Sequence, residues 1–164
     1  MKRALIPVLC FFMFACSEKP ATPQVSVPTS TAQLDADVEM ASAFQEARDT
    51  LNVFVQKIGT PHPDRTFAAV KVRFSPPDGS SQDIWVDEVT YTDGSFRGLM
   101  GDDIPSLHLE AGEKITVQEE DILDWMIVED GKLIGGYTIR LAVQRMSPEE
   151  KERFLETLDY LIED

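Results

Sequence analysis

The strongest constraint on the fold is a series of short strand-like segments between residues 67 and 143, separated by turn residues. In the first segment, Val70, Val72 and Phe74 alternate with charged side chains, as expected for a strand with one buried face. The connections are short and rich in Gly, Pro and Asp, and short connections join antiparallel neighbours. We therefore predict an antiparallel sheet of about six strands. The predicted strands cover residues 67–74, 83–91, 95–100, 113–118 and the two arms of a hairpin within 124–143.

The last hairpin is predicted from Asp130-Gly131, because both residues tolerate the positive φ of a type I′ turn. Its second arm is expected to run as a strand to Val143, interrupted by Gly135 and Gly136. Two adjacent glycines inside a strand pattern indicate a bulge or a sharp bend, interpreted here as the corner of a small barrel. One face of this arm would carry Leu133, Tyr137, Ile139, Leu141 and Val143.

Helical patterns flank the strand segments on both sides. Apolar residues spaced three and four apart over residues 37–58 predict an amphipathic helix that Gly59 and Pro61 stop. Residues 147–150, SPEE, match a capping box with proline at the first helical position, which predicts a terminal helix. Its apolar side would consist of Phe154, Leu155, Leu158, Leu161 and Ile162. The predicted class is α+β, an antiparallel, strongly bent sheet or small barrel-like roll with an N-terminal and a C-terminal helix packed on it.

The N-terminus has the features of an export signal. Lys2 and Arg3 precede an apolar run of about 12 residues, which is shorter than the roughly 20 that cross a bilayer. Cys16 follows Ala15, an arrangement that resembles the bacterial lipobox, in which the cysteine is acylated. The alternative is an ordinary signal peptide with an incidental cysteine. Residues 17–36 are rich in Pro, Ser, Thr and Ala, which is typical of a flexible tether.

These features predict the domain organisation and the location. We expect a lipoprotein signal peptide at residues 1–15, the lipidated Cys16 with a disordered tether at 16–36, and a single domain at 37–164. A lipid on Cys16 would hold the chain to a membrane. Ser17 resembles the residue that follows the cysteine in outer-membrane lipoproteins of proteobacteria. We therefore expect a lipid-anchored protein of the bacterial cell envelope, at the outer membrane and facing the periplasm.

The charge balance limits the partners. The chain has 15 Lys and Arg residues against 29 Asp and Glu residues, a formal net charge of −14. Such a domain repels nucleic acid, and no basic stripe in the sequence offsets this repulsion. We predict no nucleic-acid partner.

The strand and turn segments are similar to those of a bacterial protein family. They are FAAVKVRFS, IWVDEV, DGSFRGLM, AGEKITV, ILDWMIVEDGKLIGGYTIR and MSPEE, in this order and spacing. Over about residues 38–160 they resemble domain-of-unknown-function family 2314, the YegJ-like bacterial proteins. The most specific part is Asp124-Trp125 after Ile122, followed by Gly131 and residues 135–140. Because this family has no established activity, the resemblance supports the fold and leaves the function open.

No catalytic set, metal site or cofactor is predicted. Processing accounts for Cys10 and Cys16, and the two histidines lie in separate loop-like stretches without metal-ligand spacing. We expect His62 in an exposed loop and His108 as a half-buried polar side chain. The acidic clusters are expected to be solvated surface groups. They comprise residues 102–103, 119–121 with Asp124, and 129–130.

The candidate binding surface consists of Trp85, Asp124, Trp125, Tyr137 and Arg140. In this interpretation the bend at residues 135–136 opens a groove lined by Trp125, Tyr137 and Arg140. The alternative is that Trp125 fills the core while Asp124 caps a neighbouring backbone turn. A bulge at residues 87–88 would re-aim Trp85 toward solvent.

These observations favour a non-enzymatic binding module with an envelope protein or the cell wall as its partner. One alternative is an envelope hydrolase or modifying enzyme that uses Asp124 and a second carboxylate. The other is a periplasmic inhibitor or immunity-type protein, whose negative charge would attract a cationic enzyme.

Overall fold

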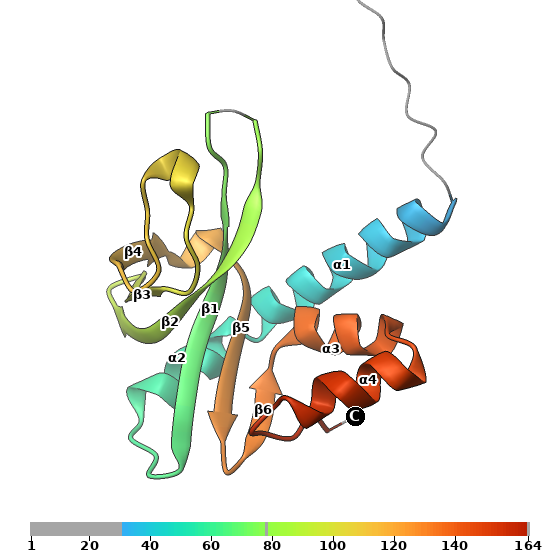
Figure 1. Cartoon of the computed structure of the whole chain (residues 1–164). Helices are drawn as coiled ribbons and strands as arrows, with labels where there is room; N and C mark the ends of the chain where they lie inside the picture. Colours follow the sequence, from blue (N-terminus) through green and yellow to red (C-terminus); the bar gives the residue numbers. More distant parts are fainter. Residues whose placement is uncertain (1–30, 78, 164) are drawn as a thin grey trace, which may run out of the picture.

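A six-stranded antiparallel sheet forms the centre of the fold, in the order β4-β3-β2-β1-β5-β6 (Figure 1). The computed structural model describes residues 31–77 and 79–163. Within this part of the chain, β4 and β6 lie at the two edges, so the sheet is open and does not close into a barrel. The predicted α+β class with an antiparallel sheet is confirmed. The strands are β1 (Arg65–Phe74), β2 (Gln82–Thr92), β3 (Ser95–Met100), β4 (Lys114–Gln118), β5 (Ile122–Glu129) and β6 (Lys132–Gly135).

Two helices, α1 (Thr31–Asp49) and α2 (Leu51–Gly59), take the place of the single helix predicted over residues 37–58. The break is at Thr50, whose hydroxyl donates to the carbonyl of Glu46 at 2.7 Å and so competes with the regular helical pattern. Because α1 begins at Thr31, residues 31–36 of the predicted tether are helical. The predicted signal peptide, Cys16 and the remainder of the tether lie outside the described residues.

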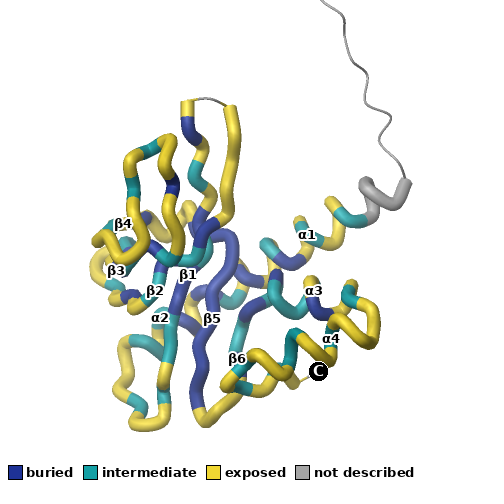
Figure 2. Tube along the Cα trace, in the orientation of Figure 1, coloured by how far each residue is buried: buried dark blue, intermediate teal, exposed yellow. Residues whose placement is uncertain are grey.

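The main core lies between these helices and one face of the sheet. Phe54 of α2 stacks on Trp125 with ring centroids 5.3 Å apart, and its ring centroid lies 5.7 Å from that of Phe96 in β3. Such aromatic pairs contribute about 0.5–1.5 kcal/mol each beyond the area they bury. Every residue of β5 is buried, as the dark tube in Figure 2 shows, because this strand is covered on both faces.

A second, smaller core lies on the opposite face of the sheet. Met126 and Val128 alternate along β5 with the residues that face α2, so they point to this opposite face. Ile139, Tyr160 and Ile162 pack against them from the C-terminal part of the chain. The sheet therefore has one face under α1 and α2 and a second face that the C-terminal elements cover in part (Figure 1).

The β5–β6 hairpin turns at Asp130 and Gly131, which have φ values of 53° and 69°. Both lie in the region that a type I′ turn requires, and this confirms the predicted turn. The prediction that the second arm continues to Val143 is wrong, because β6 ends at Gly135 and α3 (Tyr137–Arg145) follows. The physical cause is the positive φ of Gly135 (71°) and Gly136 (65°), which turns the chain from strand into helix.

The C-terminal helix α4 (Pro148–Glu156) begins with the predicted capping box, formed by Ser147 and Glu150. It ends at Glu156, so the prediction that Leu158, Leu161 and Ile162 continue the helix is wrong. Instead, the amide of Leu161 donates to the carbonyl of Gly131 at 2.8 Å, and its own carbonyl accepts from the amide of Leu133 at 2.8 Å. Pairing with the open edge of β6 thus competes with a further helical turn.

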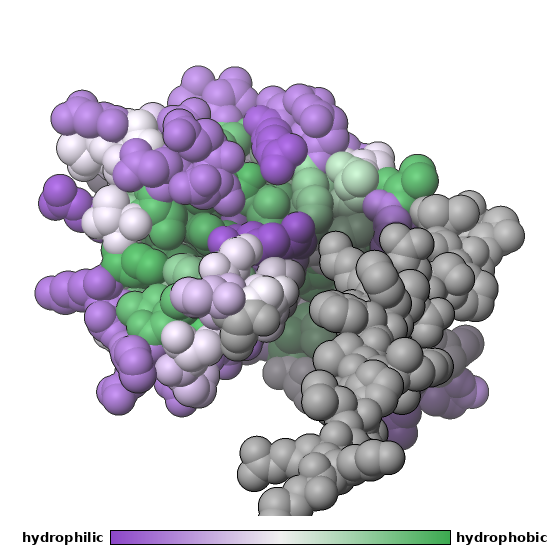
Figure 3. Space-filling model, turned by 90° about the horizontal axis from the view of Figure 1, so that it is seen from above, coloured by the Kyte–Doolittle hydropathy of each residue, from purple (hydrophilic) through white to green (hydrophobic). Residues whose placement is uncertain are grey.

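Seen from above, apolar atoms are exposed in a central area flanked by hydrophilic side chains (Figure 3). Among the described residues, no helix combines the length and the apolar composition that a membrane crossing requires.

Candidate functional site

Two residues of the predicted binding surface, Asp124 and Trp125, are buried. Their exposed fractions are 0% and 2%, so neither side chain contributes to the surface of this structure. The indole nitrogen of Trp125 donates to the carbonyl of Ala47 at 3.0 Å, which ties β5 to the end of α1. Trp125 thus fills the core, as the alternative interpretation expects.

The Asp124 carboxylate caps the N-terminus of α3. One oxygen accepts from the amides of Trp125 (2.8 Å) and Tyr137 (3.2 Å). The other accepts from the amide and the hydroxyl of Thr138, at 2.8 Å and 2.7 Å. Burial raises the pKa of Asp124, while the hydrogen bonds from Thr138 and Trp125 and the charge of Lys71 act in the opposite direction. Four donors on one carboxylate are the arrangement of a structural cap.

Lys71 completes this network and was not identified from the sequence. Its ammonium donates to the hydroxyl of Thr138 at 2.7 Å. Burial lowers the pKa of Lys71, and the charge of Asp124 opposes this change. Lysine, threonine and aspartate together could serve nucleophilic chemistry, but Thr138 is buried. None of the three side chains lines the hollow between α1 and α3 or the hollow beside Trp85 and Tyr160.

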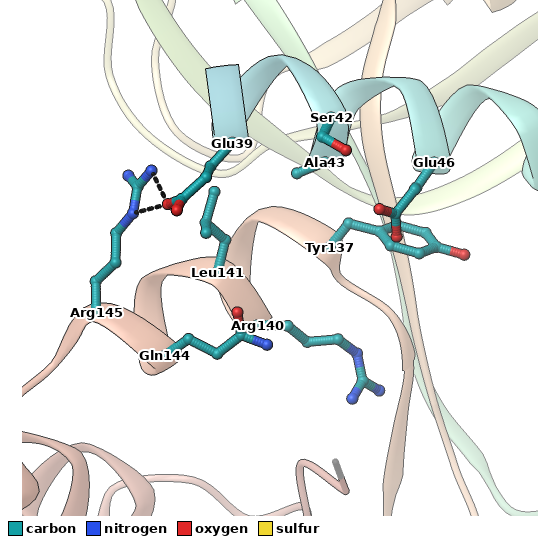
Figure 4. A pocket seen from close by; sticks show the side chains of 9 residues that line it. All are labelled: Glu39, Ser42, Ala43, Glu46, Tyr137, Arg140, Leu141, Gln144 and Arg145. Atoms are coloured by element: carbon teal, nitrogen blue, oxygen red, sulfur yellow. Dashed lines mark hydrogen bonds and ion pairs between the residues drawn. The ribbon is translucent and has the colours of Figure 1, made fainter. Parts of the chain in front are cut away.

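Tyr137 and Arg140 line a hollow of about 400 Å³ between α1 and α3 (Figure 4). Arg140 is committed to the backbone, because its guanidinium donates to the carbonyls of Gly135 and Leu133 at 2.8 Å each. At the other end of the hollow, Glu39 and Arg145 form an ion pair at 2.7 Å. This hollow differs from the predicted groove, because Trp125 is buried and does not line it. Glu39 and Arg145 pair with each other, and the guanidinium of Arg140 binds backbone carbonyls.

A larger hollow of about 500 Å³ lies on the second face of the sheet, beside the C-terminal elements. We call it the sheet hollow. A neighbouring hollow of about 400 Å³ shares Thr66, Phe67 and Asp87 with it, so the two adjoin across β1 and β2. The sheet hollow is lined by Thr66, Phe67, Trp85, Asp87, Gly101, Asp102, Met126, Val128, Ile139, Asp159 and Tyr160.

Aromatic side chains line the sheet hollow from three separate segments. Trp85 comes from β2, Phe67 from β1 and Tyr160 from the segment after α4. Trp85 lies opposite Lys71, whose ammonium is 4.7 Å from the centre of the indole ring. The predicted bulge lies just after Trp85 in the chain, where the β2–β3 register shifts between Asp87 and Thr90. Trp85 is half-buried, on the opposite face of the sheet from Trp125.

Three carboxylates lie among these rings: Asp87, Asp102 and Asp159. Burial raises the pKa of Asp87, and the negative charges of Asp102 and Glu88 add to this effect. Burial and the charge of Asp159 raise the pKa of Tyr160. Asp87 lies in the first arm of the β2–β3 hairpin and Asp102 just after the second, whereas Asp159 comes from the C-terminal segment, so no local pattern indicates that the three meet.

The two histidines differ from expectation. His108 is exposed instead of half-buried, with a φ of 56°. His62 is half-buried, and its Nε2 lies 3.8 Å from a carboxylate oxygen of Glu129 and 4.0 Å from one of Asp130. These three groups are close enough to hold a metal ion. However, Glu129 already binds two cationic side chains, which an incoming ion would have to displace.

Glu129 was predicted to be a solvated surface group, but its side chain is only 8% exposed. It accepts from Lys57 at 2.7 Å and from Arg65 at 3.0 Å. The hydrogen bond from Lys57 lowers the pKa of Glu129, Arg65 adds to this effect, and burial opposes it. A lowered carboxyl pKa stabilises the folded state above the unfolded-state pKa.

Replacing Glu129 by Gln should therefore lower the free energy of unfolding at pH 7 by about 1–2 kcal/mol. The difference from wild type should persist down to the ordinary Glu pKa of about 4.3 and disappear as the pH falls through the lower pKa of Glu129. Urea denaturation over a pH series measures this. Glu120→Gln, at an exposed position, is the control. A difference that stays constant to the lowest pH would contradict the charge-based explanation.

Comparison with known proteins places the chain among bacterial relatives. "Uncharacterized protein YegJ" of Escherichia coli strain K12 is 34% identical over 102 residues, which cover 61% of this chain and 64% of the relative. A "Putative ankyrin repeat protein" of Neisseria meningitidis serogroup B is 37% identical over 91 residues, or 52% of this chain and 35% of that protein. The chain thus spans less than two thirds of the length of either relative. No solved structure matches it.

The family comparison covers most of the domain. The family model described as "Uncharacterized protein conserved in bacteria (DUF2314)" matches residues 37–160. This range includes all six strands and α2, α3 and α4. The chain therefore belongs to the DUF2314 family of bacterial proteins, as the resemblance of its strand and turn segments predicted.

Proposed function

We propose that this chain is a lipid-anchored protein of the bacterial cell envelope and that its domain is a non-enzymatic binding module. The observation that carries the proposal is the sheet hollow, where aromatic rings and carboxylates surround an open space of about 500 Å³. Concave sites with apolar walls and a few polar groups are the usual form of a binding site. The tether would hold this surface away from the membrane and leave it accessible to an envelope partner.

The strongest catalytic candidates are occupied by structural roles, which supports binding over catalysis. Asp124 caps α3, and Thr138 is buried against it. A second candidate function comes from Asp87 and Asp102, because two carboxylates in one hollow can perform acid–base hydrolysis. Release of soluble fragments from cell-wall material, lost in Asp87→Asn, would favour this alternative.

Photo-crosslinking in intact bacteria tests the binding function. A benzophenone amino acid replaces Tyr160 or Phe67, both at the sheet hollow, or Val53, an exposed residue of α2 outside it. We expect covalent adducts at the first two positions and none at Val53, and we expect Trp85→Ala to abolish them. Equal adducts at all three positions, or none at Tyr160 and Phe67, would contradict the proposal.

Replacing Cys16 by Ser tests the anchor. If the acyl chains on Cys16 hold the protein to the membrane, Cys16→Ser should shift it from the membrane fraction to the soluble fraction. Fractionation in high salt measures the change, because salt removes proteins bound by charge alone. Cys10→Ser, inside the predicted signal peptide, is the control and should leave the protein anchored. Persistent membrane association of Cys16→Ser in high salt would contradict lipid anchoring.

A further inference from the structure

The sheet hollow carries negative charge that the described part of the chain does not neutralise. Asp87, Asp102 and Asp159 line it, and none of them forms an ion pair or accepts a side-chain hydrogen bond among the described residues. The two nearest cations of β1 already have partners: Lys71, beside Trp85, donates to Thr138 at 2.7 Å, and Arg65, which lines the neighbouring hollow, binds Glu129 at 3.0 Å. No lysine, arginine or histidine is among the described residues that line the sheet hollow.

The aromatic walls suit a cation as well. Trp85, Phe67 and Tyr160 line the same space as the carboxylates. The ammonium of Lys71 lies 4.7 Å from the ring centre of Trp85, so an incoming cation would use the part of Trp85 that lines the hollow. Aromatic faces beside carboxylates bind guanidinium and ammonium groups through cation–π attraction and ion pairing together.

Size and lining favour a side chain on a polypeptide over a bare ion. Met126, Val128 and Ile139 provide apolar wall, which would contact the methylene groups of an arginine or lysine stem. The neighbouring hollow of about 400 Å³ extends the site beyond a single side chain. The net charge of −14 would attract a basic segment at a distance and repel a second copy of this chain.

From these features we infer that the sheet hollow recognises a positively charged segment of a partner protein and takes one of its arginine or lysine side chains. This inference rests on the proposed binding function and names the chemistry of the partner. Asp87 and Asp102 supply the counter-charge, and Trp85 supplies the stacking surface.

Calorimetric titration of the full-length chain in non-ionic detergent with a defined peptide tests the inference. The probe is a Gly/Ser peptide with spaced arginines, and its matched control carries citrulline, which keeps the shape of arginine without its charge. We expect the arginine peptide to bind at least about tenfold more tightly than the citrulline peptide. Raising NaCl from about 50 mM to about 500 mM should weaken binding at least about tenfold, because salt screens the attraction.

Variants separate the site from the general negative charge. Asp87→Asn and Trp85→Ala should each weaken arginine-peptide binding about fivefold or more. Glu149→Gln removes the same charge as Asp87→Asn at an exposed position outside the hollow and should leave binding unchanged. Asp102→Asn provides the same test if Asp87→Asn fails to fold. Equal binding of the citrulline peptide, or equal losses in Asp87→Asn and Glu149→Gln, would overturn the inference.

The crosslinking and titration experiments together distinguish failure of this inference from failure of the proposed binding function. Adducts at Tyr160 without arginine-dependent peptide binding would overturn the cationic partner and keep the binding module. If neither Tyr160 adducts nor arginine-dependent peptide binding were found, the inference and the proposed binding function would both be overturned. Concentration-dependent dimerisation that Trp85→Ala abolishes would assign the hollow to a second copy and would also overturn the inference.

Discussion

Gly135→Ala is expected to lower the free energy of unfolding by about 3 kcal/mol, through backbone strain and overpacking together. Gly135 has a φ of +71°, a backbone conformation that residues with a side chain rarely adopt. A Cβ atom there would lie 2.5 Å from Cε3 of the Trp125 ring and 2.5 Å from the Trp125 carbonyl oxygen. The ring cannot yield easily, because it is buried and stacked on Phe54 at 5.3 Å.

Gly131→Ala is the matched control for this prediction. Its φ of +69° is nearly the same, but nothing lies within 4 Å of the added Cβ atom. Strain alone should therefore cost about 1 kcal/mol. Gly136→Ala should fall between the two, because its Cβ would meet only the side chain of Leu133, at 2.9 Å. Urea denaturation followed by circular dichroism ranks the three variants. Equal losses at Gly131 and Gly135 would show that the contact with Trp125 carries no energy.

The fold was predictable where local residue patterns and tertiary structure agree. Alternating apolar residues indicated β1 and β2, and Asp130-Gly131 indicated the last hairpin, because the turn chemistry requires only neighbouring residues. From the sequence alone, the glycines at 135 and 136 predict a barrel corner. Their positive φ values fit either a bend within a strand or the start of a helix. The Asp124 cap decides for the helix, and that contact spans 14 positions in sequence.

The same reasoning explains the helix boundaries. The apolar spacing continues through Thr50, so the sequence alone gave no sign of a break. Thr50 also contacts Tyr137, with their hydroxyl oxygens 2.8 Å apart, and this partner is 87 positions away. At the other end, the apolar pattern that suggests a longer terminal helix includes Ile162, which packs against the second core from outside any helix. The backbone of Leu161 pairs with β6 there.

The candidate site was only partly predictable. The sequence indicates Trp85, because a large aromatic residue precedes a predicted bulge, and this residue lines the sheet hollow. The sequence predicts Asp102 to be a solvated surface group and contains no pattern that distinguishes Asp87 or Asp159 from other acidic residues. Their significance depends on β2, the loop after β3 and the segment after α4 meeting on one face. No local sequence pattern indicates that these three segments lie together. Asp124-Trp125 is a distinctive sequence motif, but both residues are buried in the structure.

Asp124→Ala is expected to have the largest effect, a loss of about 3–5 kcal/mol in the free energy of unfolding. The change removes the acceptor of four hydrogen bonds, which come from Trp125, Tyr137 and Thr138. These donors are shielded from water, so most would stay unsatisfied. The ammonium of Lys71 would also lose the negative charge that compensates its burial. The start of α3 should become mobile, and urea denaturation with amide hydrogen exchange measures both consequences.

Two comparisons identify the cap as the cause of the Asp124→Ala effect. Asp121→Ala makes the same chemical change at an exposed position three residues earlier and should cost no more than about 0.5 kcal/mol. Asp124→Asn keeps one acceptor oxygen and should lose less than Asp124→Ala, because a single oxygen can still bind two of the donors. If Asp124→Ala and Asp121→Ala were equally mild, water would have to replace the carboxylate at the helix terminus. The amides of Tyr137 and Thr138 would then exchange no faster than in wild type, and α3 would owe its position to packing against α1 instead of to Asp124.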